Sequence, residues 1–179
     1  MNLKGGQVER CQYASRERVP VRVTEGPETR DDPLAGLPLW ALVLLAARAV
    51  RRAALTLPPG EREPLLEGCD RLVDGALAGV LERSYRFEGG SSPVALALEA
   101  AVDAAHAAEA SLDFSAAETA CLNSTKRALA YAAQQAETSL QAAILVASDV
   151  DLLRFATDEF GIRRYDPLTS DVLARLTPS

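Results

Sequence analysis

Alanine is the residue that most constrains what this chain can fold into. The sequence holds 32 alanines among its 179 residues, while aromatic residues make up only 5% of it. Alanine is the best helix former, because it has no side-chain entropy to lose when a helix forms. Small side chains also let helix axes approach to the lower end of the usual range of about 8–10 Å. The composition therefore predicts an all-α protein, packed as a compact bundle with little room inside.

The net charge of the chain argues against nucleic acid as a partner. The formal net charge is −6, whereas a protein that binds phosphate backbones carries a clustered basic surface. The uncharged run over residues 34–47 ends at Arg48, well short of the roughly 20 residues that span a bilayer. We therefore expect a protein that binds neither nucleic acid nor membrane.

Cysteine and histidine are too sparse to indicate a disulfide framework or a zinc site. The three cysteines, Cys11, Cys69 and Cys121, lie far apart, and the chain contains a single histidine. This usage fits a reducing compartment, and we expect a cytoplasmic protein without a cofactor. Cys69 lies within an apolar stripe of helical spacing, which favours a core residue over a nucleophile.

The first 33 residues differ in composition from the rest, because they are polar, contain three prolines and show little helical periodicity. Within them Val19, Val21 and Val23 alternate with polar or cyclic residues, at the period of a half-buried strand. The backbone groups of a lone strand must pair with water, with the rest of the chain or with a partner. We expect residues 1–33 to be an extended or disordered arm, with these three valines as candidate partner-binding residues, and residues 34–179 to form the helical domain.

Apolar spacing and capping residues predict five or six helices with mostly short connections. Between Ser115 and Ala147 no glycine or proline interrupts the pattern, so that region can be one long helix. Ser148 or Asp149 can instead cap a separate helix, and we expect a break there. The expected helices cover residues 37–57, 63–86, 93–111, 115–147, 149–160 and 170–176.

The first expected helix is apolar on all sides over residues 39–46, which predicts a place in the middle of the fold. Arg48, Arg51 and Arg52 follow near its C-terminal end, where the helix dipole favours cations. They are candidates for a small-anion clamp in a regulatory bundle. The simpler interpretation is that they are surface arginines matched to the dipole.

An acidic stripe surrounds the histidine on the third expected helix. Glu99, Asp103, His106 and Glu109 follow one another at steps of three and four residues. Carboxylate and imidazole at such spacing supply ligands in di-iron carboxylate bundles, so a metal site or an enzyme built on these residues is an alternative. Those bundles, however, draw a Glu-x-x-His pair from each of two helices. With one histidine in the chain, a solvated helix face is the preferred interpretation.

Acidic residues also end the fifth expected helix, where the negative end of the dipole disfavours them. Asp158 and Glu159 occupy its final turn, and Arg163 and Arg164 follow shortly after Gly161, which is placed to terminate the helix. The four charged side chains form either an ion-paired corner or a surface that a partner recognises, because local rules are often broken at functional places. We take them as candidate partner-binding residues.

The order of these segments resembles a known group of proteins. The Trp40-Ala-Leu start, the Ala46-Ala47-Arg48 run, the proline-broken second helix and the alanine-rich helices that follow resemble the Ala-rich helical immunity proteins of bacterial toxin systems. The stretch from Asp151 to Gly161 and the tail over residues 169–176 are similar to uncharacterised Ala-rich bacterial proteins. The resemblance covers most of residues 37–176 and implies partner binding, but it assigns no functional residue.

We therefore expect a non-enzymatic partner-binding protein, such as an immunity protein, an adaptor or an accessory subunit of a bacterial complex. It would bind through its arm and its acidic helix faces, and its negative charge would steer a partner with a basic surface. A homo-oligomer is left open. The alternatives are the metal site or enzyme on the third helix and the anion clamp on the first.

Overall fold

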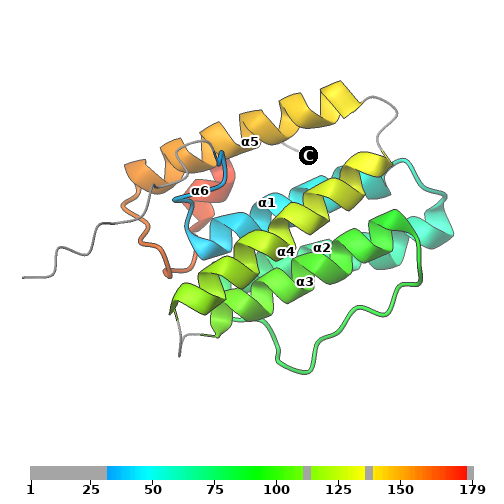
Figure 1. Ribbon diagram of the computed structural model, residues 1–179, viewed down its shortest axis with the longest axis horizontal. Helices are drawn as coiled ribbons and strands as arrows, with labels where there is room; N and C mark the ends of the chain where they lie inside the picture. Colours follow the sequence, from blue (N-terminus) through cyan, green and yellow to red (C-terminus); the bar gives the residue numbers. More distant parts are fainter. Residues whose placement is uncertain (1–31, 111–113, 136–138, 177–179) are drawn as a thin grey trace, which may run out of the picture. The chain divides into compact units, whose positions relative to one another are not determined.

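The computed structural model describes residues 32–110, 114–135 and 139–176. Over these ranges it contains six helices and no strand, so the all-α bundle is confirmed (Figure 1). The expected arm, with Val19, Val21 and Val23, lies outside the described residues except for its last two positions. The helices are α1 (Leu39–Ala54), α2 (Pro59–Ala78), α3 (Pro93–Glu109), α4 (Phe114–Gln134), α5 (Ser139–Glu159) and α6 (Ser170–Arg175).

Helix α1 occupies the centre of the bundle. Every residue from Leu39 to Val50 is buried, and the helix packs against α2, α3, α4 and α5 (Figure 1). A helix that is apolar on all sides has no face to offer to water, so the other helices must cover it. The predicted central position is confirmed.

Helices α3 and α4 form the most extensive pair in the bundle. Every described side chain of α4 that is buried is small, and α3 meets it with a face rich in alanine. Small residues on both faces let the two backbones approach closely. The predicted alanine contact faces are therefore present. The buried residues of α4 are Ala117, Cys121, Ser124, Thr125, Ala128 and Ala132.

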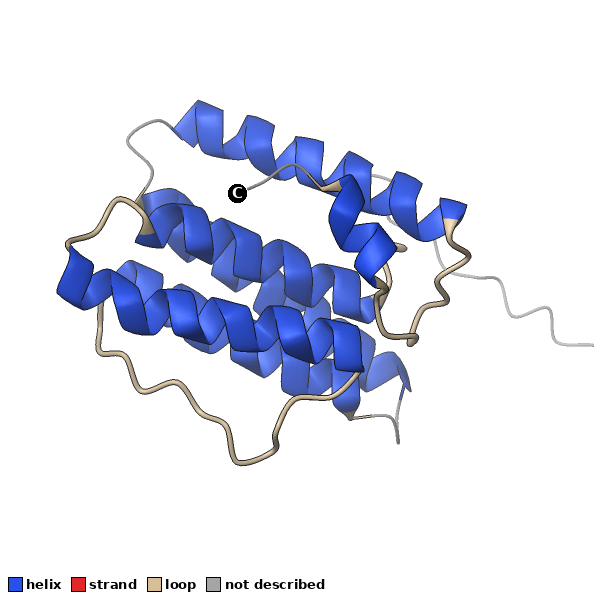
Figure 2. Ribbon diagram, turned by 180° about the vertical axis from the view of Figure 1, so that it is seen from behind, coloured by secondary structure: helices blue, strands red, loops and turns tan. Residues whose placement is uncertain are grey.

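Helix α2 is shorter than predicted. It was expected to continue to residue 86, but it ends at Ala78, and Gly79 follows in a left-handed conformation with φ +70°. A glycine adopts that conformation without steric cost and so terminates the helix. Residues 79–92 then run along α3 as a long crossover, because α2 and α3 point the same way (Figure 2). The connections are thus not all short.

The predicted break at Ser148 and Asp149 is wrong. Helix α5 begins at Ser139 and passes through both residues without interruption, and the division from α4 falls at residues 136–138, outside the described ranges. Asp149 does not cap a helix, because its side chain is buried and bound by two arginines of α1. An aspartate can cap a helix or act as a buried counter-ion, so the residue type alone does not distinguish the two roles.

Three predicted helix ends are confirmed. The Ser92 hydroxyl oxygen accepts from the Ala95 N–H at 3.2 Å, and the Thr169 hydroxyl oxygen accepts from the Val172 N–H at 3.4 Å. Gly161 ends α5 with φ +63°, and the N–H of Ile162 donates to the Thr157 carbonyl at 2.9 Å.

Of the helices within the described residues, none has both the length and the apolarity of a membrane span.

The end of α2 gives a test of this packing. Replacing Gly79 with alanine should lower the free energy of unfolding by about 1–2 kcal/mol, because a left-handed conformation disfavours a side chain. The added Cβ would also lie 3.1 Å from Pro167. In Gly60→Ala, the matched control in the first turn of α2, the new Cβ has nothing within 4 Å. That variant should be neutral or more stable by up to about 1 kcal/mol. Equal losses in urea denaturation would contradict this account of the α2 end.

Candidate functional site

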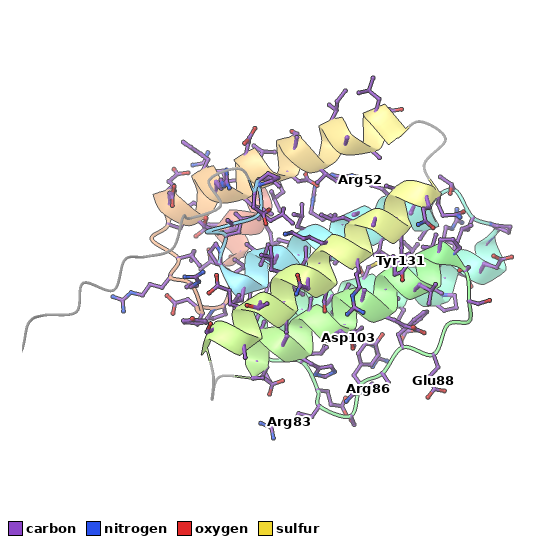
Figure 3. All side chains as sticks on the ribbon, viewed as in Figure 1. Arg52, Arg83, Arg86, Glu88, Asp103 and Tyr131 are labelled. Carbon is purple, nitrogen blue, oxygen red and sulfur yellow. The ribbon has the colours of Figure 1, made fainter. Side chains whose placement is uncertain are left out.

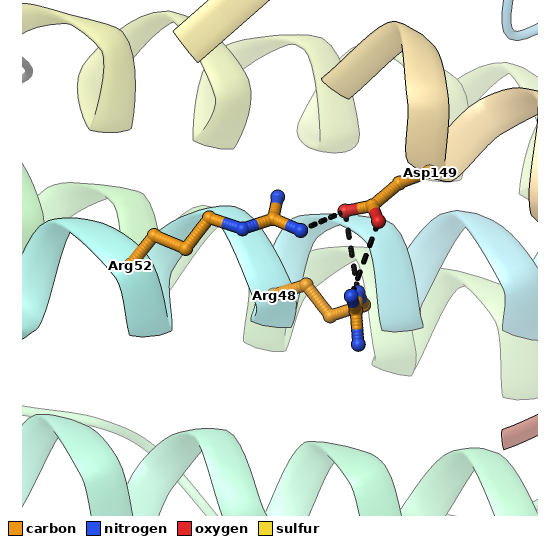
Figure 4. A network of polar contacts seen from close by, with 3 residues as sticks. All are labelled: Arg48, Arg52 and Asp149. Carbon is orange, nitrogen blue, oxygen red and sulfur yellow. Dashed lines mark hydrogen bonds and ion pairs between the residues drawn. The ribbon is translucent and has the colours of Figure 1, made fainter. Parts of the chain in front are cut away.

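A buried ion cluster joins α1 to α5. Arg48 and Arg52, one turn apart on α1, both reach Asp149 of α5 (Figure 4). Arg48 donates from Nε and Nη2 to the two carboxylate oxygens at 3.2 and 3.1 Å, and Arg52 Nη2 lies 2.6 Å from Oδ2. The side chain of Asp149 is only 1% exposed. We call these three residues the ion cluster.

The ion cluster sets how α5 lies on α1. Removing a carboxylate from water costs several kcal/mol, and that cost is offset only where close partners satisfy its oxygens. Two arginines at i and i+4 share one face of α1, so both can reach the same carboxylate. Asp149 is the one charged residue among the described residues of α5 that is buried. Any slip of α5 along α1 would leave it unpaired.

The ion cluster changes the interpretation of the expected anion clamp. Arg48 and Arg52 bind a carboxylate of the chain itself, and Arg51 points elsewhere and pairs with Asp70 of α2. The three arginines therefore do not converge on one pocket, and two of them are not simple surface residues. The missed signal was the position of Asp149, which shares a helix face with the buried Leu153 and Ala156.

A groove lies beside the ion cluster, between α1, α4 and α5. Its volume is about 630 Å³, and its lining is mostly apolar. Arg52 is the one charged residue that lines it, and Figure 3 shows this side chain between α5 and the helices below. The expectation of little interior room does not hold here, because the first half of α5 packs less closely than the second half. The lining residues are Ala49, Arg52, Ala53, Thr56, Leu129, Ala130, Ala132, Ala133, Gln141, Ala142, Ala143, Leu145 and Val146.

The outer face of α5 carries exposed apolar side chains. Leu140, Ile144 and Phe155 are 72%, 58% and 64% exposed. Their spacing places them on one side of the helix, together with the exposed Asp151 and Asp158. We call these five residues the α5 stripe. Sequence reasoning noted Asp158 but missed the rest, because apolar residues recur on several sides of this helix.

The candidate metal residues of α3 are drawn into contacts with arginines. Asp103 lies 3.8 Å from Arg127, and Glu109 lies 3.5 Å from Arg83. Figure 3 shows Asp103 on α3 and Arg83 on the crossover loop. His106 Nε2 lies 3.0 Å from the carbonyl oxygen of Tyr85. Across the described ranges, no three His, Cys, Asp or Glu side chains are grouped so that they could hold a metal ion. Glu99 therefore joins no such set with Asp103, His106 and Glu109.

The predicted ion-paired corner at the end of α5 uses different partners. Glu159 pairs with Arg175 of α6 at 2.7 Å, and Arg164 pairs with Glu118 of α4. Neither arginine that follows α5 pairs with Asp158 or Glu159 among the described contacts. Arg163 contributes its backbone N–H, which donates to Asp166 at 3.1 Å. The long-range partners could not be inferred from adjacency, since the chain turns between them.

Arg154 lies one turn before Asp158 but binds the segment that precedes α1. Its Nη2 donates to the carbonyl oxygens of Pro33 and Ala35 at 2.6 and 3.1 Å. The segment that precedes α1 is thereby tied to α5.

Cys69 and Cys121 are buried thiols without a disulfide. Burial raises the pKa of Cys69 and of Cys121 to about 12. The thiolate is the nucleophile and the metal ligand, so these residues are chemically quiet at neutral pH. The prediction that Cys69 is a core residue is confirmed.

No protein-family model, curated protein or solved structure matches the chain.

Loss of the charge of Asp149 should strongly lower the stability of the fold. Asp149→Asn should lower the free energy of unfolding by about 3 kcal/mol, because it leaves the buried Arg48 and the partly buried Arg52 without a counter-charge. Asp151→Asn, two residues along the same helix and exposed, should change it by less than about 0.5 kcal/mol. Chemical denaturation followed by circular dichroism measures both. Equal stability of the Asp149→Asn and Asp151→Asn variants would show that the cluster does not hold α5.

The burial of the two thiols predicts that they are protected from alkylation and that the stability of the fold depends on pH. Iodoacetamide at pH 8 should leave Cys69 and Cys121 unmodified in the folded protein and modify both in urea, as read by mass spectrometry of peptides. An unfolded thiol ionises near pH 8.5, whereas the folded ones stay protonated. The folded state thus holds more protons, and stability should fall as the pH rises from about 9 toward 12. Rapid alkylation of the folded protein at pH 8 would contradict their burial.

Proposed function

We propose that this chain is a non-enzymatic partner-binding protein that engages its partner through the α5 stripe. The observation that carries the proposal is the concentration of exposed apolar side chains on one helix. Seven large apolar residues are exposed within the described ranges, and four of them belong to α5. Single apolar residues are normal on a protein surface, whereas several on one side of one helix favour an interaction site.

The stripe has the spacing of a helix that packs against another surface. Ile144 follows Leu140 by four residues and Phe155 follows Ile144 by eleven, so all three lie along one line of the helix. Each such side chain contributes about 1.5–3 kcal/mol when it moves from water into a fully apolar contact. The helical core cannot supply that contact, because the opposite side of α5 faces α1 through Asp149 and Leu153.

The charges of the stripe define the partner's chemistry. Asp151 and Asp158 lie among its apolar residues and make no ion pair with any described residue. The whole chain is acidic, with a formal charge of −6, so long-range attraction favours a basic partner. We infer a protein partner with an apolar patch flanked by lysine or arginine. A partner of this kind suits an immunity protein, an adaptor or an accessory subunit.

The corner at the end of α5 has a smaller part in this proposal than the sequence suggested. Glu159 and Arg164 are occupied by Arg175 and Glu118, so they support the local fold. Asp158 remains available to a partner, and Arg163, five residues further along the chain, is also exposed. Binding by the N-terminal arm stays a prediction.

The test compares matched surface variants. Ile144→Ala and Phe155→Ala should each weaken the complex by at least about tenfold, as truncation of buried anchor residues does. Val80→Ala removes an apolar side chain that is 50% exposed but lies outside α5, and should leave affinity unchanged. The partner is first captured from cells of the source organism, then purified and titrated against each variant by calorimetry.

The dependence of affinity on ionic strength is a second test of the same complex. Affinity should fall as ionic strength rises and should become less salt-sensitive in Asp151→Asn, because that carboxylate would face a basic group. If the stripe variants bind the purified partner as tightly as the wild type, the stripe is not the interface. A dimer that Phe155→Ala dissociates in sedimentation equilibrium would identify the partner as a second copy.

A further inference from the structure

We propose that the groove between α1, α4 and α5 binds an amphiphilic carboxylate, a fatty acid, with its head group at Arg52 and its tail along the alanines of α4. This site is separate from the α5 stripe, and it does not depend on the proposed partner binding.

The head group is assigned by an unsatisfied donor. Arg52 uses Nη2 to reach Asp149, but its Nη1 is buried and has no hydrogen-bond partner within the described part of the chain. Figure 4 shows this nitrogen directed away from the contact with Asp149. A charged donor without a partner is unfavourable, and the Arg52 side chain is 20% exposed where it lines the groove. Because Nη1 itself is closed to water, the guanidinium group must turn toward the groove for this nitrogen to donate to a ligand oxygen.

The charge balance favours an anion with a single charge. The carboxylate of Asp149 is shared between Arg48 and Arg52, so the charge of Arg52 is only partly compensated. No aspartate or glutamate is among the residues that line the groove. One ligand carboxylate would complete the compensation. A doubly charged phosphate would bring excess negative charge close to Asp149, in a region where unbalanced charge is costly.

The apolar tail of the ligand is inferred from the residues that line the groove. All but three of the lining residues are apolar, and alanines of α4 face Leu145 and Val146 of α5 across the groove. The volume of about 630 Å³ lies within the range of about 300–1,000 Å³ that is typical of ligand pockets. The small side chains that let helices pack closely elsewhere leave space here, because the first half of α5 is not buried against them. An acyl chain fills such a narrow apolar space without requiring polar partners.

The experiment titrates the full chain with dodecanoate below its micelle concentration, by isothermal calorimetry. We expect saturable binding of one molecule per chain. Decanoate and octanoate should bind more weakly, by about fourfold for each methylene removed. Dodecyltrimethylammonium has a similar tail but a cationic head, and it should bind at least tenfold more weakly than dodecanoate.

Three variants locate the site. Arg52→Met should weaken dodecanoate binding at least tenfold, because it removes the head-group donor and keeps a similar apolar stem. Arg51→Met, the neighbouring arginine that does not line the groove, should bind like the wild type. Ala133→Phe should abolish binding by filling the groove, and it leaves the ion cluster intact. Circular dichroism confirms that each variant is folded.

Several outcomes would overturn the proposal. They are no binding of dodecanoate by the full chain, equal binding of the cationic amphiphile, or full binding by Ala133→Phe. If Arg52→Met fails to fold, the chain-length series, the head-group comparison and Ala133→Phe still decide.

Discussion

The contact of Asp149 with Arg48 and Arg52 is the interaction on which the arrangement of α5 depends. It is the point at which a charged group of α5 enters the interior, and its geometry leaves little freedom for rotation or translation of that helix. The inner face of α5 therefore packs against α1, and the opposite face is exposed to solvent. Both the α5 stripe and the groove follow from that choice. A purely apolar contact would have specified the orientation of α5 less sharply, because apolar contacts are not directional.

The parts of the fold that could be predicted are those that depend on local chemistry. The all-round apolar character of residues 39–46 placed α1 at the centre, and the hydroxyls of Ser92 and Thr169 marked the starts of α3 and α6. Gly161 marked the end of α5. In each case one residue type satisfies a requirement that few others meet, such as a free backbone N–H or a left-handed conformation.

The parts that could not be predicted depend on which segments meet. Asp149 has the chemistry of a helix cap and also that of a buried counter-ion, and only the approach of α1 distinguishes the two roles. Gly79 ends α2 four residues after Gly75, but a glycine within an apolar pattern does not by itself end a helix. Arg175 and Glu118 are the partners of Glu159 and Arg164 because the chain folds back on itself. The groove lies where the first half of α5 is only loosely packed against α1 and α4, and no short sequence window contains that arrangement.

The burial of α1 on every side has a consequence for biosynthesis. This helix leaves the ribosome before α2, α3 and α4, and each of those later helices supplies part of its cover. Until about residue 134 has been synthesised, part of this apolar helix lacks its cover. Nascent chains with exposed apolar surface are prone to association, and chaperones bind such surfaces. The order of helices along the chain thus leaves open, during synthesis, an apolar surface of the kind that chaperones bind, although the finished fold covers it.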